Sequence, residues 1–184
     1  MEGQKMILAL DVSTSITGIT ILSSDNTIVL CEAVDTRNKR YYPSLLVKAA
    51  AIKKKLLEIS SRYEIKEVFI EESLQSFRSG FSSAKTLSTL SKINGIVSYI
   101  AYEVFKKEPE FIAATTARKL CGIKVPRGQK AKKVVLNFLL DSEPSFEIEY
   151  TRQGNPSPDS YDRADSLVIA RAGQEICRQR NLKF

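Results

Sequence analysis

The sequence predicts an α/β fold in which a mixed five-stranded sheet carries helices on both faces. Two observations lead to this fold class. Three short apolar segments follow one another closely at the start of the chain, separated only by tight turns. After them, segments with helical periodicity alternate with short apolar segments, a pattern typical of parallel strands joined by crossover helices. We therefore expect three antiparallel strands, extended by further strands that run parallel to the first.

The individual elements follow from hydrophobic periodicity and from turn residues. Strands are expected at residues 6–12, 16–22, 27–34, 67–72 and 110–114. Helices are expected at residues 44–62, 83–106, 115–121, 129–141 and 160–178. The helix at 83–106 has a buried stripe that includes Leu87, Leu90 and Val97. Small residues interrupt its apolar stripes and would allow a second helix to approach closely: Ser91, Asn94, Gly95 and Ser98.

Length and composition indicate one soluble domain that spans residues 1–184. Apolar residues make up 43% of the chain and charged residues 27%. No apolar run reaches the length of a transmembrane helix, and the first residues lack the pattern of a signal peptide. Three widely spaced cysteines, Cys31, Cys121 and Cys177, are typical of reduced thiols. We therefore expect an intracellular protein of the cytoplasm or an organelle, neither secreted nor bound to a membrane.

Charge and the absence of histidine narrow the chemistry. The net charge is +7, which favours a polyanionic partner. The sequence contains no histidine. Ser-His-Asp and Cys-His catalysis and histidine-based zinc sites are thereby excluded. Any hydrolysis must use carboxylates, a hydroxyl, a thiol or a lysine, and no small-molecule cofactor is indicated.

Four carboxylates stand at positions where the expected elements bring them together. Asp11 ends the first strand and Glu71 ends the fourth, and parallel strands place their carboxyl ends at one edge of a sheet. Asp162 and Asp165 share one face near the start of the last helix. Four acids at one place repel each other unless divalent cations neutralise them, and oxygen ligands suit Mg²⁺ or Mn²⁺. Each acid alone could instead be a turn residue, a helix-dipole partner or a solvated strand end.

Three segments carry a resemblance to a known family. The segment ILALDVSTSITGITIL resembles the first strand pair of RuvC-like Holliday junction resolvases, with an Asp ending strand one and a Gly in strand two. VFIEES resembles their second motif, and YDRADSLVIARA resembles their last motif, D-x-x-D followed by a helix with small apolar residues. These segments occur in the family's order across nearly the whole chain. The resemblance implies a ribonuclease-H-like fold.

The resemblance also implies a reaction and its residues. Asp11, Glu71, Asp162 and Asp165 match the family's catalytic metal-binding acids, and Lys130 matches the basic residue near the scissile phosphate. Two Mg²⁺ ions about 4 Å apart, with Mn²⁺ as a substitute, would support an in-line displacement that yields a 5′-phosphate and a 3′-hydroxyl. The implied activity is that of a crossover junction endodeoxyribonuclease, a homodimer that cuts four-way DNA junctions and pairs its subunits through the long helix.

Two further segments are candidates for contact with DNA. The basic segment of residues 124–133 contains no acid and precedes a helix, a position that suits phosphate binding, although it could also be a solvated helix face. Its cations are Lys124, Arg127, Lys130, Lys132 and Lys133. The loop at 73–82 holds Phe77, Arg78 and Phe81, which could stack on unpaired bases or fold back on the core. In the family, an aromatic residue at this place enters the junction centre.

Three other functions are compatible with parts of the sequence. A sugar-kinase-like or actin-like phosphotransferase also opens with strand, Asp, turn and strand, but it needs two such domains. A ribonuclease H that cuts RNA–DNA hybrids would use the same carboxylates. A non-catalytic nucleic-acid-binding module could keep the fold without the chemistry, but the presence of all four acids argues against it.

Overall fold

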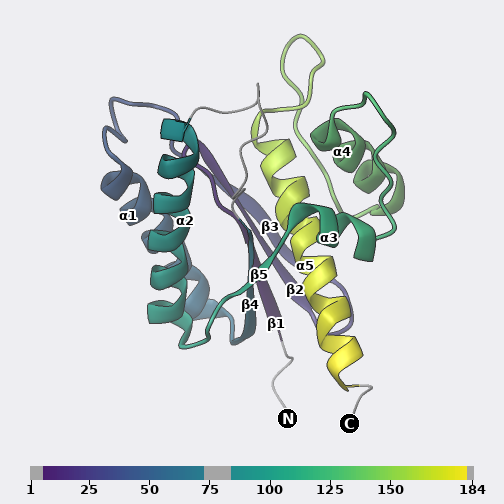
Figure 1. Ribbon diagram of the computed structural model, residues 1–184, viewed down its shortest axis with the longest axis horizontal. Helices are drawn as coiled ribbons and strands as arrows, with labels where there is room; N and C mark the ends of the chain where they lie inside the picture. The colour runs from purple at the N-terminus through teal and green to yellow at the C-terminus, as the bar shows by residue number, and fades with distance from the viewer. Residues whose placement is uncertain (1–5, 73–83, 182–184) are drawn as a thin grey trace.

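The computed structural model describes residues 6–72 and 84–181 (Figure 1). Its strands are β1 (Met6–Asp11), β2 (Ile16–Ser23), β3 (Ile28–Asp35), β4 (Ile65–Glu71) and β5 (Glu110–Ile112). Its helices are α1 (Leu45–Arg62), α2 (Ala84–Phe105), α3 (Ala114–Leu120), α4 (Ala131–Ser142) and α5 (Asp159–Asn181). The strands form one sheet in the order β3-β2-β1-β4-β5.

The sheet has the predicted mixture of strand directions. β2 runs antiparallel to both β1 and β3, whereas β4 runs parallel to β1 and β5 runs parallel to β4. The predicted fold class is therefore confirmed: a ribonuclease-H-like mixed sheet of five strands with helices on both faces. Because β1 and β4 are parallel neighbours, their carboxyl ends meet at the same edge of the sheet.

Each face of the sheet carries its own apolar core, because successive side chains of a strand point to opposite faces. On one face, α1 and α2 cover Leu8 and Leu10 of β1. On the other face, α5 covers Ala9 of β1 and Phe69 of β4, with α3 and α4 packed outside it. Figure 1 shows the two helical layers, with the sheet between them. β1 lies at the centre of both cores.

The boundaries of the elements differ from prediction by a few residues. β4 begins two residues earlier than expected, at Ile65. Ile65 is buried, and the more exposed Lys66 and Glu67 that follow it conceal the start of the strand in the sequence. α4 begins at Ala131 rather than at residue 129, and Lys130 is its N-cap. None of the helices in the described ranges is long and apolar enough to cross a membrane. Cys31, Cys121 and Cys177 are free thiols, as expected.

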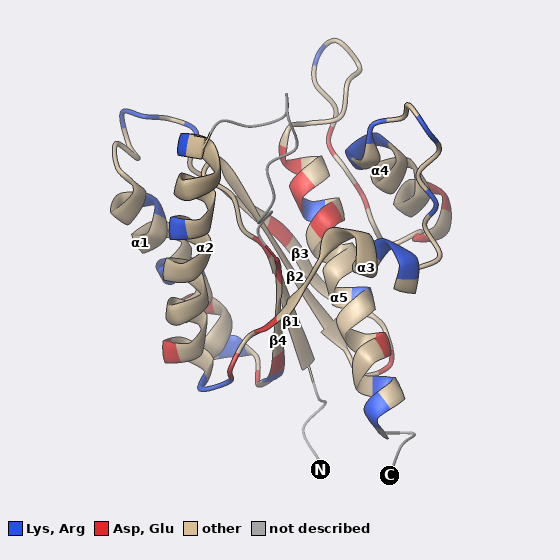
Figure 2. Ribbon diagram, in the orientation of Figure 1, with Lys and Arg blue, Asp and Glu red and all other residues tan. Residues whose placement is uncertain are grey.

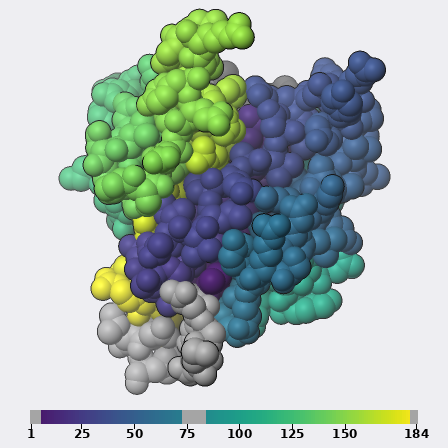
Figure 3. Space-filling model, turned by 180° about the vertical axis from the view of Figure 1, so that it is seen from behind, coloured from purple at the N-terminus to yellow at the C-terminus, as the bar shows by residue number. Residues whose placement is uncertain are grey.

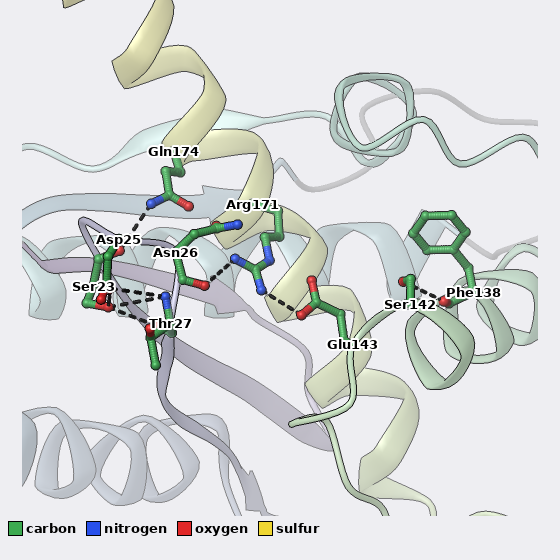
Figure 4. A network of polar contacts seen from close by, with 9 residues as sticks. All are labelled: Ser23, Asp25, Asn26, Thr27, Phe138, Ser142, Glu143, Arg171 and Gln174. Atoms are coloured by element: carbon green, nitrogen blue, oxygen red, sulfur yellow. Dashed lines mark hydrogen bonds and ion pairs between the residues drawn. The ribbon is translucent and has the colours of Figure 1, made fainter.

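A polar network locks α5 to the turn between β2 and β3 (Figure 4). The Arg171 guanidinium donates to the carbonyl oxygen of Asn26 at 2.6 Å and pairs with Glu143 at 2.7 Å. The Gln174 amide donates to the carbonyl oxygen of Ser23 at 3.1 Å. Asn26, Glu143, Arg171 and Gln174 line a cavity of about 860 Å³ at the edge where β1 and β4 begin. The cavity is therefore at the opposite edge of the sheet from Asp11 and Glu71.

Candidate active site

The carboxyl ends of β1 and β4 place Asp11 and Glu71 side by side. Leu10 pairs with Ile70 in the parallel register, so the next residue of each strand lies at the same edge of the sheet. Asp11 is only 8% exposed, although it is an acidic residue. The backbone carbonyl of Glu71 is held by Asn94 of α2, whose side-chain amide donates to it at 3.0 Å. The edge of the sheet thus presents two carboxylates from adjacent strands, one of them supported by a buried amide.

The first turns of α5 bring two further carboxylates to this edge. Asp162 and Asp165 are three residues apart and share one face of the helix. α5 packs directly on β1 and β2, and a buried hydrogen bond of 2.8 Å joins Thr20 of β2 to Ser166. Asp162 is 8% exposed. The four acids singled out from the sequence therefore come together at one place in the fold.

Burial and mutual repulsion perturb the titration of all four acids. Burial raises the pKa of Asp11 well above its ordinary value, and the charges of Glu71 and Asp165 raise it further. Burial and the charge of Asp165 raise the pKa of Glu71 to about 7. Burial also raises the pKa values of Asp162 and Asp165. The raised pKa values mean that the charged forms of these carboxyl groups are destabilised. A cation bound nearby would stabilise the charged forms and lower the pKa values again.

The cation that the chain itself places among these acids is Lys132 of α4. Its ammonium group donates to Asp162 Oδ1 at 3.0 Å and lies 3.5 Å from Asp165 Oδ2. Partial loss of hydration opposes its charge, but Asp165, Asp11 and Asp162 together raise the pKa of Lys132 above its ordinary value. The side chain remains 57% exposed, so Lys132 covers the carboxylates from the solvent side.

The basic residues predicted to contact DNA lie at different distances from the carboxylates, and Lys130 is not the one that contacts them. Lys130, matched by resemblance to the basic residue near the scissile phosphate, is an exposed N-cap, and it lines a small hollow together with Lys133. Lys132 contacts the carboxylates instead, because α4 packs on α5 with residue 132 turned toward Asp162 and Asp165. Lys124, Arg127 and Lys133 are exposed on the same segment. Phe77, Arg78 and Phe81 lie outside the described residues.

Two residues near the acids were not singled out from the sequence as part of the site. Asn94 was read as a small residue at a helix–helix contact, whereas it is buried and bonded to the Glu71 backbone. A polar residue in line with the buried stripe of α2 was the available signal. Arg118 of α3 lowers the pKa values of Glu71 and Asp165 through its charge. No sequence pattern connects this arginine with the acids, because α3 reaches them only through the tertiary fold.

The donor chemistry of the site suits a hard divalent cation, because all four candidate ligands supply carboxylate oxygens. Burial and the neighbouring acids raise the pKa values of Asp11 and Glu71, and a bound cation would offset both effects. In the side-chain positions seen here, however, no three acidic or cysteine side chains of the described ranges close around a common point. Asp162 and Asp165 contact Lys132 instead. Binding of an ion would require these side chains to turn from the ammonium group toward Asp11 and Glu71.

Comparisons with known proteins bear on the fold. No protein-family model matches the chain, and no curated protein matches its sequence. Solved structures do match. RuvC from Thermus thermophilus superimposes with a TM-score of 0.63 at 19% identity, over 95% of this chain and 96% of that one. The same protein in complex with a Holliday junction substrate gives a TM-score of 0.62 at 16% identity, with the same coverage of both chains.

The chain has the RuvC fold. The yeast mitochondrial Holliday junction resolvase also matches, with a TM-score of 0.57 at 13% identity over 98% of this chain and 85% of that one. The RuvC fold thus accounts for nearly all of the chain, in agreement with the resemblance of the three sequence segments. In this fold, the four carboxylates of the present chain lie on β1, β4 and α5.

Proposed function

We propose that this protein is a metal-dependent, structure-specific DNA endonuclease that resolves four-way junctions. The observation that carries the proposal is the convergence of four carboxylates, two buried and two half-buried, on one edge of a RuvC-type sheet, next to a basic helix. A structure with this fold was solved with a Holliday junction substrate, which favours branched DNA as the substrate.

Asp11, Glu71, Asp162 and Asp165 are the residues that would hold divalent ions, Mg²⁺ or Mn²⁺. Two bound ions would supply the Lewis acidity that activates water and stabilises the departing 3′-oxygen, so the products would be a 5′-phosphate and a 3′-hydroxyl. Asp11, on the central strand of the sheet, would be one of the residues that hold these ions, together with Glu71 of the adjacent strand. Because the site is built from oxygen ligands, it performs hydrolysis without the histidine that the chain lacks.

Lys132 supplies the protein's own positive charge at the reacting phosphate. In the present arrangement its ammonium group neutralises Asp162 and Asp165. When cations take over that task, the ammonium group is free to contact a phosphate oxygen from the solvent side, where it is already exposed. Lys124, Arg127, Lys130 and Lys133 extend this positive charge along the DNA backbone and position the strand without reading its sequence.

The protein acts as a homodimer in this proposal, because two nicks across a four-way junction require two sites related by a two-fold axis. The outer face of α2 supports this, since Tyr99 and Tyr102 are exposed large side chains on it and Gly95 is open to solvent. The loop at 73–82, with Phe77, Arg78 and Phe81, connects the Glu71 strand end to this helix. We propose that it contacts the open junction centre. Sedimentation at micromolar concentration, with and without junction DNA, tests the dimer.

The proposal is tested by cleavage assays on purified protein with Mg²⁺. We expect a labelled four-way junction to be cut at symmetric positions, while a matched duplex and an RNA–DNA hybrid of the same sequence remain intact. Asp11→Asn is the control, because it removes one charged ligand at constant volume. It should abolish cleavage while junction binding in EDTA persists.

Each other outcome identifies a different function. Preferential cleavage of the hybrid would make the protein a ribonuclease H. Junction binding without cleavage at any Mg²⁺ or Mn²⁺ concentration would make it a non-catalytic binding module, with Lys132 as a permanent occupant of the site. Cleavage by Asp11→Asn within a few-fold of wild type would contradict the assignment of the site.

A further inference from the structure

The loop between β3 and α1 is a basic surface that the proposed function has not used. This basic loop, residues 36–43, contains Arg37, Lys39 and Arg40 and no acid. Arg37 is paired with Asp35 at 2.6 Å. Lys39 and Arg40 are exposed, and their side chains have no hydrogen-bond or ion-pair partner in the part of the chain that the structure describes. Tyr41 follows them and is 66% exposed.

Hydrogen bonds within the basic loop hold these side chains outward in a defined turn. The carbonyl oxygen of Asn38 accepts from the backbone N–H groups of Tyr41 at 3.1 Å and Tyr42 at 2.9 Å. Asn38 Oδ1 accepts from the backbone N–H of Arg40 at 3.0 Å. Because the backbone is bonded in this way, the loop itself need not be ordered when DNA binds, so that part of the entropic cost of binding is avoided.

The basic loop is fastened to the turn that follows Asp11. Buried Thr36 donates to the carbonyl oxygen of Ser15 twice, from its backbone N–H at 2.8 Å and from its hydroxyl at 3.0 Å. The Lys48 ammonium group of α1 donates to the carbonyl oxygen of Thr14 in the same turn. The basic loop therefore moves together with the strand that carries Asp11.

The basic loop lies on the other side of the carboxylates from the basic segment 124–133. The pKa of Arg37 is raised chiefly by Asp35 and further by the charges of Asp159 and Asp162, so the loop lies within electrostatic reach of the start of α5. In Figure 2, the acidic residues at the start of α5 lie between basic residues of α4 and those of the loop before α1. Figure 3, seen from behind, shows this dark-blue loop and the light-green segment before α5 as two projections at the upper edge.

We propose that the basic loop is a second DNA-backbone-binding surface, which holds the substrate from the side opposite to the basic segment 124–133. This inference rests on the proposed nuclease function. Four carboxylates repel a polyanion, so a strand reaches them only where flanking positive charge outweighs that repulsion. Unpaired cations on both flanks provide this, whereas one flank alone would let the DNA tilt away from the acids. Exposed Tyr41 adds a flat aromatic surface next to the phosphate contacts.

The test compares two double variants that lose the same charge. Lys39→Ala/Arg40→Ala removes the two unpaired cations of the basic loop. Arg62→Ala/Lys107→Ala removes two exposed cations near the starts of β4 and β5, at the opposite edge of the sheet. Affinity for a four-way junction and a duplex is measured in EDTA over a range of salt concentrations. Each lost phosphate contact lowers the log–log salt slope by ~0.9, so the loop variant should lose ~1.8 and the control almost nothing.

The outcomes separate this inference from the proposed function. If the wild type binds DNA and the loop variant binds with the same salt slope, the loop assignment is overturned and the nuclease proposal is left intact. An equal loss in both variants would show an effect of net charge and would also overturn it. If the wild type binds no DNA, both proposals fail. Equal melting temperatures of the three proteins exclude misfolding, since Asn38 and Thr36, which hold the loop, remain unchanged.

Discussion

A β-carbon on Gly18 would lie 1.9 Å from the backbone carbonyl oxygen of Asp162, so β2 and α5 meet where no side chain fits. Gly18 pairs with Asp11 in the sheet. Gly18 therefore lies next to Asp11 in the sheet, and its lack of a side chain allows Asp162 of α5 to approach β2 closely. The glycine in the second strand is explained by this close approach.

Gly18→Ala should damage both stability and activity. The new methyl group meets backbone atoms, so α5 must retreat, and overpacking of this kind costs about 1–3 kcal/mol of unfolding free energy or more. Displacement of Asp162 and Asp165 by about 1 Å should lower cleavage by on the order of 100-fold. Gly95→Ala is the matched control for the unfolding free energy, because nothing lies within 4 Å of a β-carbon there. It should stabilise α2 by roughly 0.5–1 kcal/mol. Urea unfolding of both variants and junction cleavage by Gly18→Ala check this, and an unaltered Gly18→Ala protein would contradict it.

The raised pKa of Glu71 makes stability depend on pH, in the same direction as the raised pKa values of Asp11, Asp162 and Asp165. The pKa of Glu71 is about 7 in the folded protein against an ordinary value of 4.5. The folded state therefore binds more protons than the unfolded state in this window, and the free energy of unfolding should fall as pH rises from about 4.5 to about 7. Glu71→Gln should reduce this slope and make the ion-free protein more stable than wild type at pH 8, by on the order of 2–3 kcal/mol. The two proteins should be nearly equal at pH 4.

Urea unfolding in EDTA at several pH values measures this difference. Added Mg²⁺ should raise the midpoint of the wild type more than that of Glu71→Gln, because an ion that binds only the folded state stabilises it. The contrary result is a wild-type stability that stays constant or rises between pH 4.5 and 7, with identical behaviour of Glu71→Gln. That result would show that the charged form of Glu71 is not destabilised by its surroundings.

Lys132 and Lys130 should have separable roles. Lys132→Ala removes the ammonium group that contacts Asp162 and Asp165, so cleavage should fall by on the order of 100-fold with a smaller change in binding. Lys130→Ala should mainly lower the salt slope of binding by ~0.9, since this exposed N-cap residue is available only to the DNA backbone. Single-turnover cleavage and salt-dependent binding of the two variants distinguish these effects. Equal losses of turnover in both would contradict the distinction.

Arg171 should matter for stability and not for catalysis. Arg171→Ala would leave Glu143 largely buried without its partner and release the turn at Asn26. We expect a loss of roughly 2–4 kcal/mol, somewhat less than for a fully buried pair. Arg178→Ala removes an exposed ion pair with Glu175 and should leave the unfolding free energy unchanged. Unfolding midpoints measure both. Junction cleavage by folded Arg171→Ala below its melting temperature should match wild type, and a specific loss would link this network to the site.

Much of the fold and the acidic residues could be predicted because they depend on local patterns. Apolar strands that end in acid predicted Asp11 and Glu71, and three-residue spacing placed Asp162 and Asp165 on one helix face. The identity of the contacting lysine could not be predicted, because the residue of α4 that faces α5 depends on how the two helices pack in the tertiary fold. Asn94 was misread for a related reason: the face that a polar residue presents on α2 depends on how that helix is rotated against the sheet.

The central position of β1 determines how the site can open. Its residues Leu8, Ala9 and Leu10 are fully buried, alternately in the two cores, and β1 is bonded to β2 on one side and β4 on the other. Backbone amides of such a strand exchange with deuterated solvent only when the whole molecule unfolds, whereas loops and helix ends exchange through local fraying. The backbone amides around Asp11 should therefore exchange with the free energy of global unfolding. A substitution that weakens either core should lower the protection of these amides.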